Sequence, residues 1–104
     1  MLDTGGERRN YARQRTHLPA EIQSGLVQAQ GTVEHLAFGG MFVRASRTLL
    51  PNTLIKIRLD LPGQISPFFG SGRVVWVQKN QGMGIQFIDL PVAECLKLEQ
   101  FLVS

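Results

Sequence analysis

The sequence has little of the chemistry on which secreted, membrane-spanning and disulfide-bonded proteins depend. It contains one cysteine in 104 residues, so no disulfide can form within the chain. Its apolar runs are well short of the roughly 20 residues that a membrane-spanning helix needs. The acidic and glycine-rich start has no apolar signal-peptide core. These absences predict a soluble protein of the reducing cytoplasm, without membrane insertion.

Motifs for catalysis are also missing. The sequence has no cysteine pair, no His-x-x-x-His spacing, no Gly-x-Ser-x-Gly turn and no P-loop. His17 and His35 would make a poor metal site without a third ligand. Cys95 is predicted to be an inert thiol in the core. We therefore expect no enzyme, no metal site and no resident cofactor.

Composition predicts one folded domain with a locally basic start. Hydrophobic residues make up 43% and charged residues 18% of the chain, which is ordinary for a globular fold. Of the net charge of +3, much lies near the N-terminus, on Arg8, Arg9, Arg13 and Arg15. Such a local cluster favours an anionic ligand over a broad DNA-binding face. Nonspecific RNA or DNA binding through this basic tail is a third and disfavoured alternative, because no aromatic stacking platform accompanies the tail. Specific DNA or RNA binding is not expected.

The chain divides into a tail and a strand-rich fold. Residues 1–15 lack apolar periodicity and are predicted to be a flexible basic tail, and residues 16–104 to be the folded domain. Residues 53–61 alternate apolar and polar side chains most clearly. Predicted turns separate about six strands and have the sequences SGLVQAQG, LLPN, PGQISP and KNQGMG.

One amphipathic helix is predicted at the C-terminus, over about residues 91–103. Pro91 is tolerated in a first helical turn, and Cys95, Leu98 and Leu102 recur at spacings of three and four. Short antiparallel strands with a closing helix favour a small barrel or sandwich. Trp76 is predicted to pack within a strand, with a place in a pocket as the alternative.

Two stretches could bind a ligand. Arg9 and Arg13 are four residues apart and could place two guanidinium groups on a phosphate or on a guanine edge. Otherwise they belong to a solvated tail. Gly39 and Gly40 either form a tight turn at glycine-only φ values or leave the backbone open to a ligand.

The ordered set of motifs resembles the PilZ domain family, over roughly residues 7–103. Residues 9–13 read RNYAR and match the family's RxxxR motif, and GGMFV, GRVVWV and GMGIQFIDL follow in the family's order. The resemblance implies a six-stranded antiparallel β-barrel with a C-terminal helix packed on it. It also implies a bacterial receptor for the second messenger cyclic di-GMP.

The second family motif, [D/N]xSxxG, is altered. With Gly40 as its glycine, His35 stands where the family has Asp or Asn, and Ala37 where it has Ser. The family's acidic or amide group pairs with a guanine edge, and its serine reaches a phosphate. The ligand-binding residues implied here are Arg8, Arg9, Arg13, His35, Gly39 and Gly40.

Two hypotheses follow. The first is a cyclic di-GMP receptor whose N-terminal tail becomes ordered on binding and signals to an unidentified protein partner. The second is a degenerate PilZ adaptor that binds no nucleotide and acts through protein contacts, in the control of motility, biofilm or surface appendages. The intact Arg9 and Arg13 favour the first hypothesis, and His35 and Ala37 favour the second.

Overall fold

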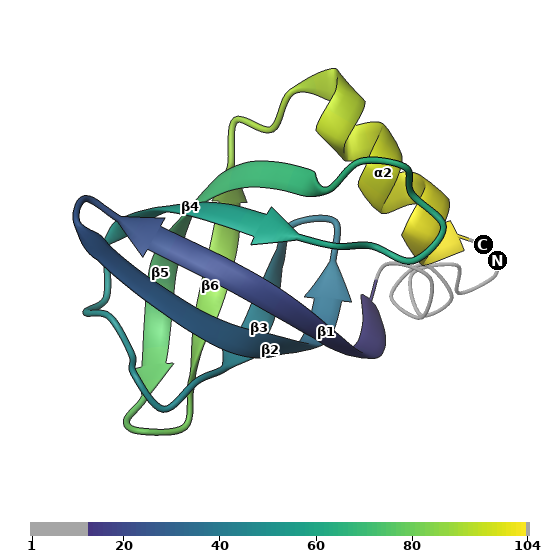
Figure 1. The fold of residues 1–104 in the computed structure, drawn as a ribbon. Helices are drawn as coiled ribbons and strands as arrows, with labels where there is room; N and C mark the ends of the chain where they lie inside the picture. The colour runs from purple at the N-terminus through teal and green to yellow at the C-terminus, as the bar shows by residue number, and fades with distance from the viewer. Residues whose placement is uncertain (1–12, 104) are drawn as a thin grey trace, which may run out of the picture.

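Six antiparallel strands form the body of the protein. The computed structural model describes residues 13–103. Its elements are β1 (Arg13–Ser24), β2 (Val27–Ala37), β3 (Gly40–Arg44), β4 (Leu54–Leu59), β5 (Phe68–Gln78), β6 (Gly82–Ile88) and α2 (Val92–Val103). The strands close into a barrel in the order β1-β2-β3-β6-β5-β4 (Figure 1). The predicted six-stranded antiparallel barrel with one C-terminal helix is confirmed.

The side chains of β4 alternate as the sequence predicts. Ile55, Ile57 and Leu59 are buried, whereas their neighbours Lys56 and Arg58 are exposed. This period of two fills a single core inside the barrel. The fully buried members of that core with the largest side chains are Phe68, Ile22, Leu36, Leu59, Met83, Leu98, Leu102, Val33, Val43 and Val74.

Strand pairing extends two strands beyond their predicted ends. Residues 13–15, expected in the tail, begin β1 because they pair with residues 35–37 of β2. The turn expected over SGLVQAQG is confined to residues 25–26, because Val27 already pairs with Ser24. Residues 1–12 lie outside the described part of the chain.

β6 also begins earlier than expected. Residues 82–84, assigned to the turn KNQGMG, form strand pairs with both β3 and β5. Gly82, Met83, Gly84 and Ile85 are all buried. Met83 and Ile85 belong to the core, and the two glycines are covered on the outside of the barrel by Phe42 and Trp76. The glycines therefore serve close packing within a strand.

Gly40 allows β3 to approach β6 closely. It pairs with Gln86, and a Cβ atom on it would collide with the carbonyl oxygen of Ile85. A Cβ atom on Gly39 would meet nothing within 4 Å. The chain does turn tightly between β2 and β3, at residues 38 and 39. Among the described glycines only Gly25 and Gly63 have positive φ, so the expectation that Gly39 and Gly40 adopt glycine-only φ values is wrong. The barrel requires a glycine at position 40 and does not require one at position 39.

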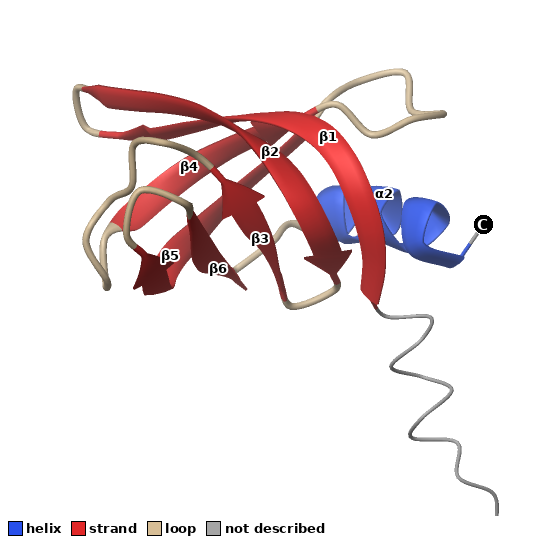
Figure 2. Ribbon diagram, turned by 90° about the horizontal axis from the view of Figure 1, so that it is seen from below, coloured by secondary structure: helices blue, strands red, loops and turns tan. Residues whose placement is uncertain are grey.

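The helix α2 packs beside one end of the barrel (Figure 2). Leu98 and Leu102 are its buried residues and belong to the barrel core. The side-chain amide of Gln14 donates to the carbonyl of Leu102 at 3.1 Å, which ties the helix to the start of β1. No helix among the described residues has both the length and the apolar character required to cross a membrane.

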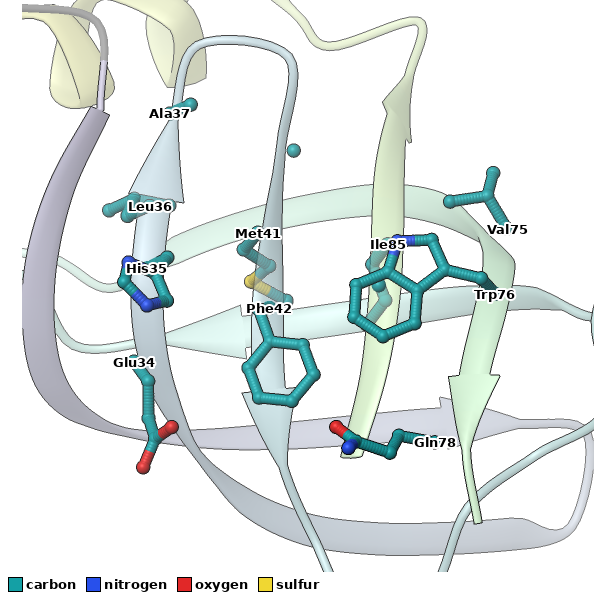
Figure 3. Close-up of a pocket in the computed structure, with 12 residues that line it drawn as sticks. Glu34, His35, Leu36, Ala37, Met41, Phe42, Val75, Trp76, Gln78 and Ile85 are labelled. Carbon is teal, nitrogen blue, oxygen red and sulfur yellow. The ribbon is translucent and has the colours of Figure 1, made fainter. Parts of the chain in front are cut away.

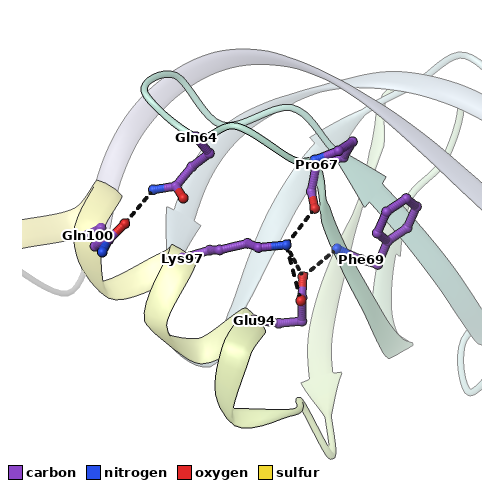
Figure 4. Close-up of polar contacts among 6 residues, drawn as sticks. All are labelled: Gln64, Pro67, Phe69, Glu94, Lys97 and Gln100. Carbon is purple, nitrogen blue, oxygen red and sulfur yellow. Dashed lines mark hydrogen bonds and ion pairs between the residues drawn. The ribbon is translucent and has the colours of Figure 1, made fainter.

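Polar contacts attach the first turns of α2 to β5 (Figure 4). The Glu94 carboxylate accepts a hydrogen bond from the Phe69 backbone N–H at 2.9 Å and pairs with Lys97 at 3.2 Å. The Lys97 ammonium also donates to the carbonyl of Pro67 at 2.9 Å. Both charged groups are largely buried and each has a partner, so neither is left unsatisfied.

The predicted core position of Cys95 is wrong. Cys95 is exposed, with its Sγ 3.8 Å from the carbonyl of Leu90. The side of the first helical turn that meets β5 carries Glu94 instead. The inward face therefore includes residues 94, 98 and 102, and Cys95 lies at its edge.

Replacing Leu98 with alanine is expected to lower the free energy of unfolding by about 2–5 kcal/mol, because it leaves a cavity beneath α2. Leu96→Ala is the matched control, since Leu96 lies on the same helix and is 51% exposed. Its loss should stay below ~1 kcal/mol. Urea unfolding monitored by circular dichroism measures both, and equal losses would contradict the packing described for α2.

The two neighbouring glycines should respond oppositely to alanine. Gly40→Ala is expected to destabilise the barrel by about 1–3 kcal/mol, because the new methyl group forces β3 away from Ile85. Gly39→Ala should be neutral or stabilising by up to ~1 kcal/mol, since the position is open and its φ is not positive. Thermal unfolding of the two variants checks this, and a loss at Gly39 that matches the loss at Gly40 would disprove it.

Candidate functional site

A pocket of about 500 Å³ opens on the outer surface of the barrel (Figure 3). It extends over β2, β3, β6 and β5. Its volume lies within the range of about 300–1,000 Å³ that is typical of small-molecule sites. The described residues that line it are Glu34, His35, Leu36, Ala37, Gly40, Met41, Phe42, Val75, Trp76, Gln78, Gly84 and Ile85.

A β-bulge in β2 turns His35 toward this pocket. Val33 and Leu36 are both fully buried although they are three residues apart, and the pairing register with β3 shifts between Val33 and His35. The bulge adds one residue to the strand and so changes which side chains face outward. His35 consequently pairs with Phe42 of β3 and lies half-buried in the pocket wall.

A second bulge, in β5, exposes Trp76. The register between β5 and β6 shifts between Val74 and Trp76, so that the consecutive residues Val75 and Trp76 are both exposed. Trp76 has 49% of its surface exposed. Trp76 therefore packs on the outer face of the sheet, against Gly84 and Phe42, and it also lines the pocket, as the alternative prediction had it.

Phe42 and Trp76 form a flat aromatic surface, which we call the aromatic platform. Their ring centroids are 5.3 Å apart and the ring planes differ by 18°. The rings lie against β6, where a Cβ atom on Gly82 would collide with Phe42 and a Cβ atom on Gly84 would collide with Trp76. Figure 3 shows His35, Phe42 and Trp76 in succession across the face of the pocket.

An ion pair neutralises the acidic residue of the pocket. Glu34 is the one acidic side chain among the described lining residues, and Arg44 binds it with two hydrogen bonds, at 2.6 and 3.2 Å. The hydrogen bond from Arg44 lowers the pKa of Glu34 and raises the pKa of Arg44. Both groups thus remain charged and paired, and Glu34 adds little net repulsion toward an anionic ligand.

The structure brings part of the predicted site together. His35 and Gly40 line the pocket, and Ala37 lies beside them. Gly39 is exposed at the adjoining turn and does not line it. Arg13 begins β1 directly opposite Ala37 in the pairing register.

Arg8 and Arg9 lie outside the described residues. His17 and His35 both lie close enough to Glu34 to contribute to the lowering of its pKa. Even so, no three His, Cys, Asp or Glu side chains within residues 13–103 are grouped to hold a metal ion.

The aromatic platform was not predicted from the sequence. Trp76 was predicted to pack within a strand, and Phe42 was given no role. The signal that could have revealed the platform is the alternation Gly82-Met83-Gly84-Ile85, in which the outward positions carry no side chain. A strand with a bare outer face provides room for aromatic rings from its neighbours.

The comparisons with solved structures agree on the fold. The chain is similar to the PilZ domain of CeSA from a cellulose-synthesizing bacterium, at 23% identity and a TM-score of 0.68, over 86% of this chain and 93% of that one. It is similar to the Bacillus subtilis inhibitor of motility MotI, at 13% identity and a TM-score of 0.76, over 88% of this chain and 48% of that one. The PilZ domain of Escherichia coli YcgR, solved with cyclic di-GMP, is 15% identical, with a TM-score of 0.66 and 86% of each chain covered.

The sequence comparison identifies the family. No curated protein is significantly similar to the chain. The family profile described as PilZ domain matches residues 7–104, which is all but the first six residues. The barrel, the C-terminal helix and the position of the second motif at the pocket agree with that match. The chain therefore belongs to the PilZ domain family.

Proposed function

We propose that this chain is a cyclic di-GMP receptor that orders its N-terminal residues on binding and thereby signals to a partner protein. The observation that carries the proposal is the pairing of Arg13 with Ala37 across β1 and β2. It joins the second arginine of the RxxxR motif to the strand that bears the altered second motif. The pocket opens at that point.

The chemistry of these residues suits a cyclic dinucleotide. Arginine binds a phosphate, or the O6 and N7 atoms of guanine, through two parallel hydrogen bonds. Arg8, Arg9 and Arg13 supply this capacity in the proposal. Gly39 leaves the backbone accessible at the turn, Gly40 lines the pocket, and His35 can accept or donate one hydrogen bond to a base edge. The YcgR domain, similar in fold, was solved with cyclic di-GMP, which supports this choice of ligand.

The output of binding in this proposal is the ordering of the N-terminal segment. Contacts from Arg8 and Arg9 to a ligand held at the pocket would fix residues 1–12 against the barrel, which gives a partner a new surface to bind. We place this activity in the bacterial cytoplasm, in the control of motility or biofilm, without catalysis and without specific DNA or RNA binding. The similarity in fold to an inhibitor of motility supports that setting.

Calorimetric titration with cyclic di-GMP tests the proposal directly. The wild-type chain should bind, and Arg13→Ala should weaken binding by about 10- to 100-fold, the loss of one or two charge-assisted hydrogen bonds. Arg58→Ala is the control, because it removes the same charge from an exposed position on β4. If the wild-type chain releases no heat at high micromolar ligand, the receptor proposal is wrong.

Restoring the motif serine should strengthen binding. Ala37→Ser adds a hydroxyl group at the pocket, and a hydrogen bond to a charged phosphate should tighten binding by about 5- to 100-fold. Ala93→Ser, an exposed position on α2, controls for a general effect of the hydroxyl group. The same titration measures both variants, and an unchanged affinity for Ala37→Ser would exclude a phosphate near residue 37.

A degenerate adaptor is the alternative function. The observation that favours it is the identity of residues 35 and 37 in the pocket wall. His35 stands in place of the family's Asp or Asn, and Ala37 in place of its Ser, so the pocket lacks an acidic or amide group and a hydroxyl group. An adaptor would release no heat with cyclic di-GMP. It would also support the same cellular phenotype with Arg13→Ala as with the wild-type sequence, because its output would need no ligand.

A further inference from the structure

Three turns form the end of the barrel opposite α2, and we call this surface the turn end. It consists of residues 24–27, 45–53 and 79–81. Figure 2 shows these turns at one end of the barrel and the helix at the other. The Ala45 N–H donates to the carbonyl of Gln81 at 2.8 Å, and the Asn52 N–H donates to the carbonyl of Val74 at 2.6 Å. These hydrogen bonds make the turn end a defined surface of the folded domain.

Exposed leucines protrude from the turn end. Leu26, at the tip of the β1–β2 turn, is fully exposed, and Leu50 is 79% exposed. Leu54 is exposed as well. It begins β4 beside the β1–β2 turn, because Lys56, two residues further along, pairs with Gln23 of β1. A single exposed leucine is common on protein surfaces, but three at one end of a small barrel form an apolar surface that the described residues leave uncovered.

The charged side chains around these leucines are positive. Arg47 and Lys79 belong to the turns themselves, and the turns contain no Asp or Glu. Lys56 follows Leu54 on the same face of β4, and Arg73 pairs with Leu54 from β5. All four basic residues are exposed, and none of them forms an ion pair with a described residue. The leucines are therefore surrounded by positive charge that is not compensated locally.

The acidic residues lie at the other end of the barrel or are paired. Asp60 and Asp89 follow β4 and β6 at the end that carries α2, and Glu94 and Glu99 belong to that helix. The two remaining described acidic residues, on β1 and β2, are paired with arginine. The folded domain thus has a positive end and a negative end, and an anionic surface would orient it with the turn end inward.

We propose that the turn end binds the surface of an anionic lipid bilayer, with Leu26 and Leu50 in the headgroup region and the basic residues near the lipid phosphates. Affinity for such a surface combines apolar burial with attraction to anionic lipids, and the turn end offers both. Hot spots of protein interfaces are mostly aromatic residues or arginine, whereas leucine is under-represented there. Aliphatic side chains on separate turns suit a deformable lipid interface better. The contact needs no spanning helix.

This orientation leaves the other functional parts of the molecule accessible. The start of β1 lies next to α2, to which Gln14 is hydrogen-bonded, and both would face away from the bilayer. Membrane contact and nucleotide binding therefore use different surfaces of the barrel. The inference does not rest on the proposed receptor function.

Co-sedimentation of the full chain with lipid vesicles tests the inference. One set of vesicles is phosphatidylcholine alone, and the other contains equal parts of phosphatidylcholine and phosphatidylserine. The wild type should bind the mixed vesicles about 10-fold or more tightly than the neutral ones, and high salt should release it. Leu26→Ser should weaken binding by about 5- to 50-fold through lost apolar burial. Lys79→Ala should weaken it by about 5-fold through the loss of one charge.

Two matched controls lie away from the turn end. Leu96→Ser removes an exposed leucine from α2, and Arg58→Ala removes an arginine that is paired with Glu21. Both should bind the vesicles as the wild type does. Circular dichroism confirms that each variant is folded before the assay. If Leu26→Ser does not fold, Leu50→Ser takes its place, and an unchanged affinity for that variant overturns the inference.

A dye attached to the turn end reports on its depth in the bilayer. An environment-sensitive fluorophore on Leu26→Cys, in a Cys95→Ser background, should shift its emission to shorter wavelength with the mixed vesicles. The same fluorophore on Glu99→Cys, at the opposite end of the molecule, should not shift. A shift at position 99 without one at position 26 would show the reverse orientation and overturn the inference.

The remaining outcomes are equally decisive. If the wild type binds neither kind of vesicle at low ionic strength, or if the control variants lose as much affinity as Leu26→Ser, the inference is wrong. It is also wrong if the chain ignores the vesicles but binds polyglutamate through Arg47 and Lys79, since the turn end would then fit an acidic protein. Binding to the mixed vesicles that Leu26→Ser and Lys79→Ala weaken and the controls do not supports it.

Discussion

The outer face of β6 carries no side chains at Gly82 and Gly84, and the packing of the candidate site depends on these two glycines. Gly82 and Gly84 alternate with the core residues Met83 and Ile85, so the strand is buried on both faces although the barrel is a single layer. Rings from the two neighbouring strands occupy the space that side chains of β6 would otherwise fill. Any larger residue at position 84 would displace the Trp76 indole ring.

The bare strand also allows close packing to fix the positions of the pocket side chains. A binding residue holds its geometry best when packing fixes it on regular secondary structure. Phe42 and Trp76 come from strands that both pair with β6, and the bulges in β2 and β5 direct His35 and Trp76 outward. At the end of the barrel where β2 finishes, Leu98 and Leu102 of α2 complete the core, so the helix supports the barrel without lining the pocket.

The buried side chains of a strand could be predicted from the sequence only where apolar and polar residues alternate without interruption. In β4 they do, and the sequence indicated the buried residues Ile55, Ile57 and Leu59 correctly. In β5 the bulge before Trp76 interrupts the alternation, and a pattern of four consecutive residues, VVWV, contains no sign of where the extra residue lies. Glycines in KNQGMG indicated a turn because turns are where glycine is commonest. Only tertiary packing shows that both glycines, Gly82 and Gly84, lie beneath aromatic rings.

The structure separates the features that the barrel requires from those that it leaves free. Gly40 is needed for the approach of β3 to β6, so its presence says little about a ligand. Gly39 has open space around it, and His35 and Ala37 lie in the pocket wall. The packing of the barrel does not account for a glycine at position 39. Substitutions at His35, Ala37 and Gly39 therefore test contacts with a ligand, whereas a substitution at Gly40 would also disturb the barrel. This short stretch of β2 and its turn is where a ligand contact can be told apart from a folding defect.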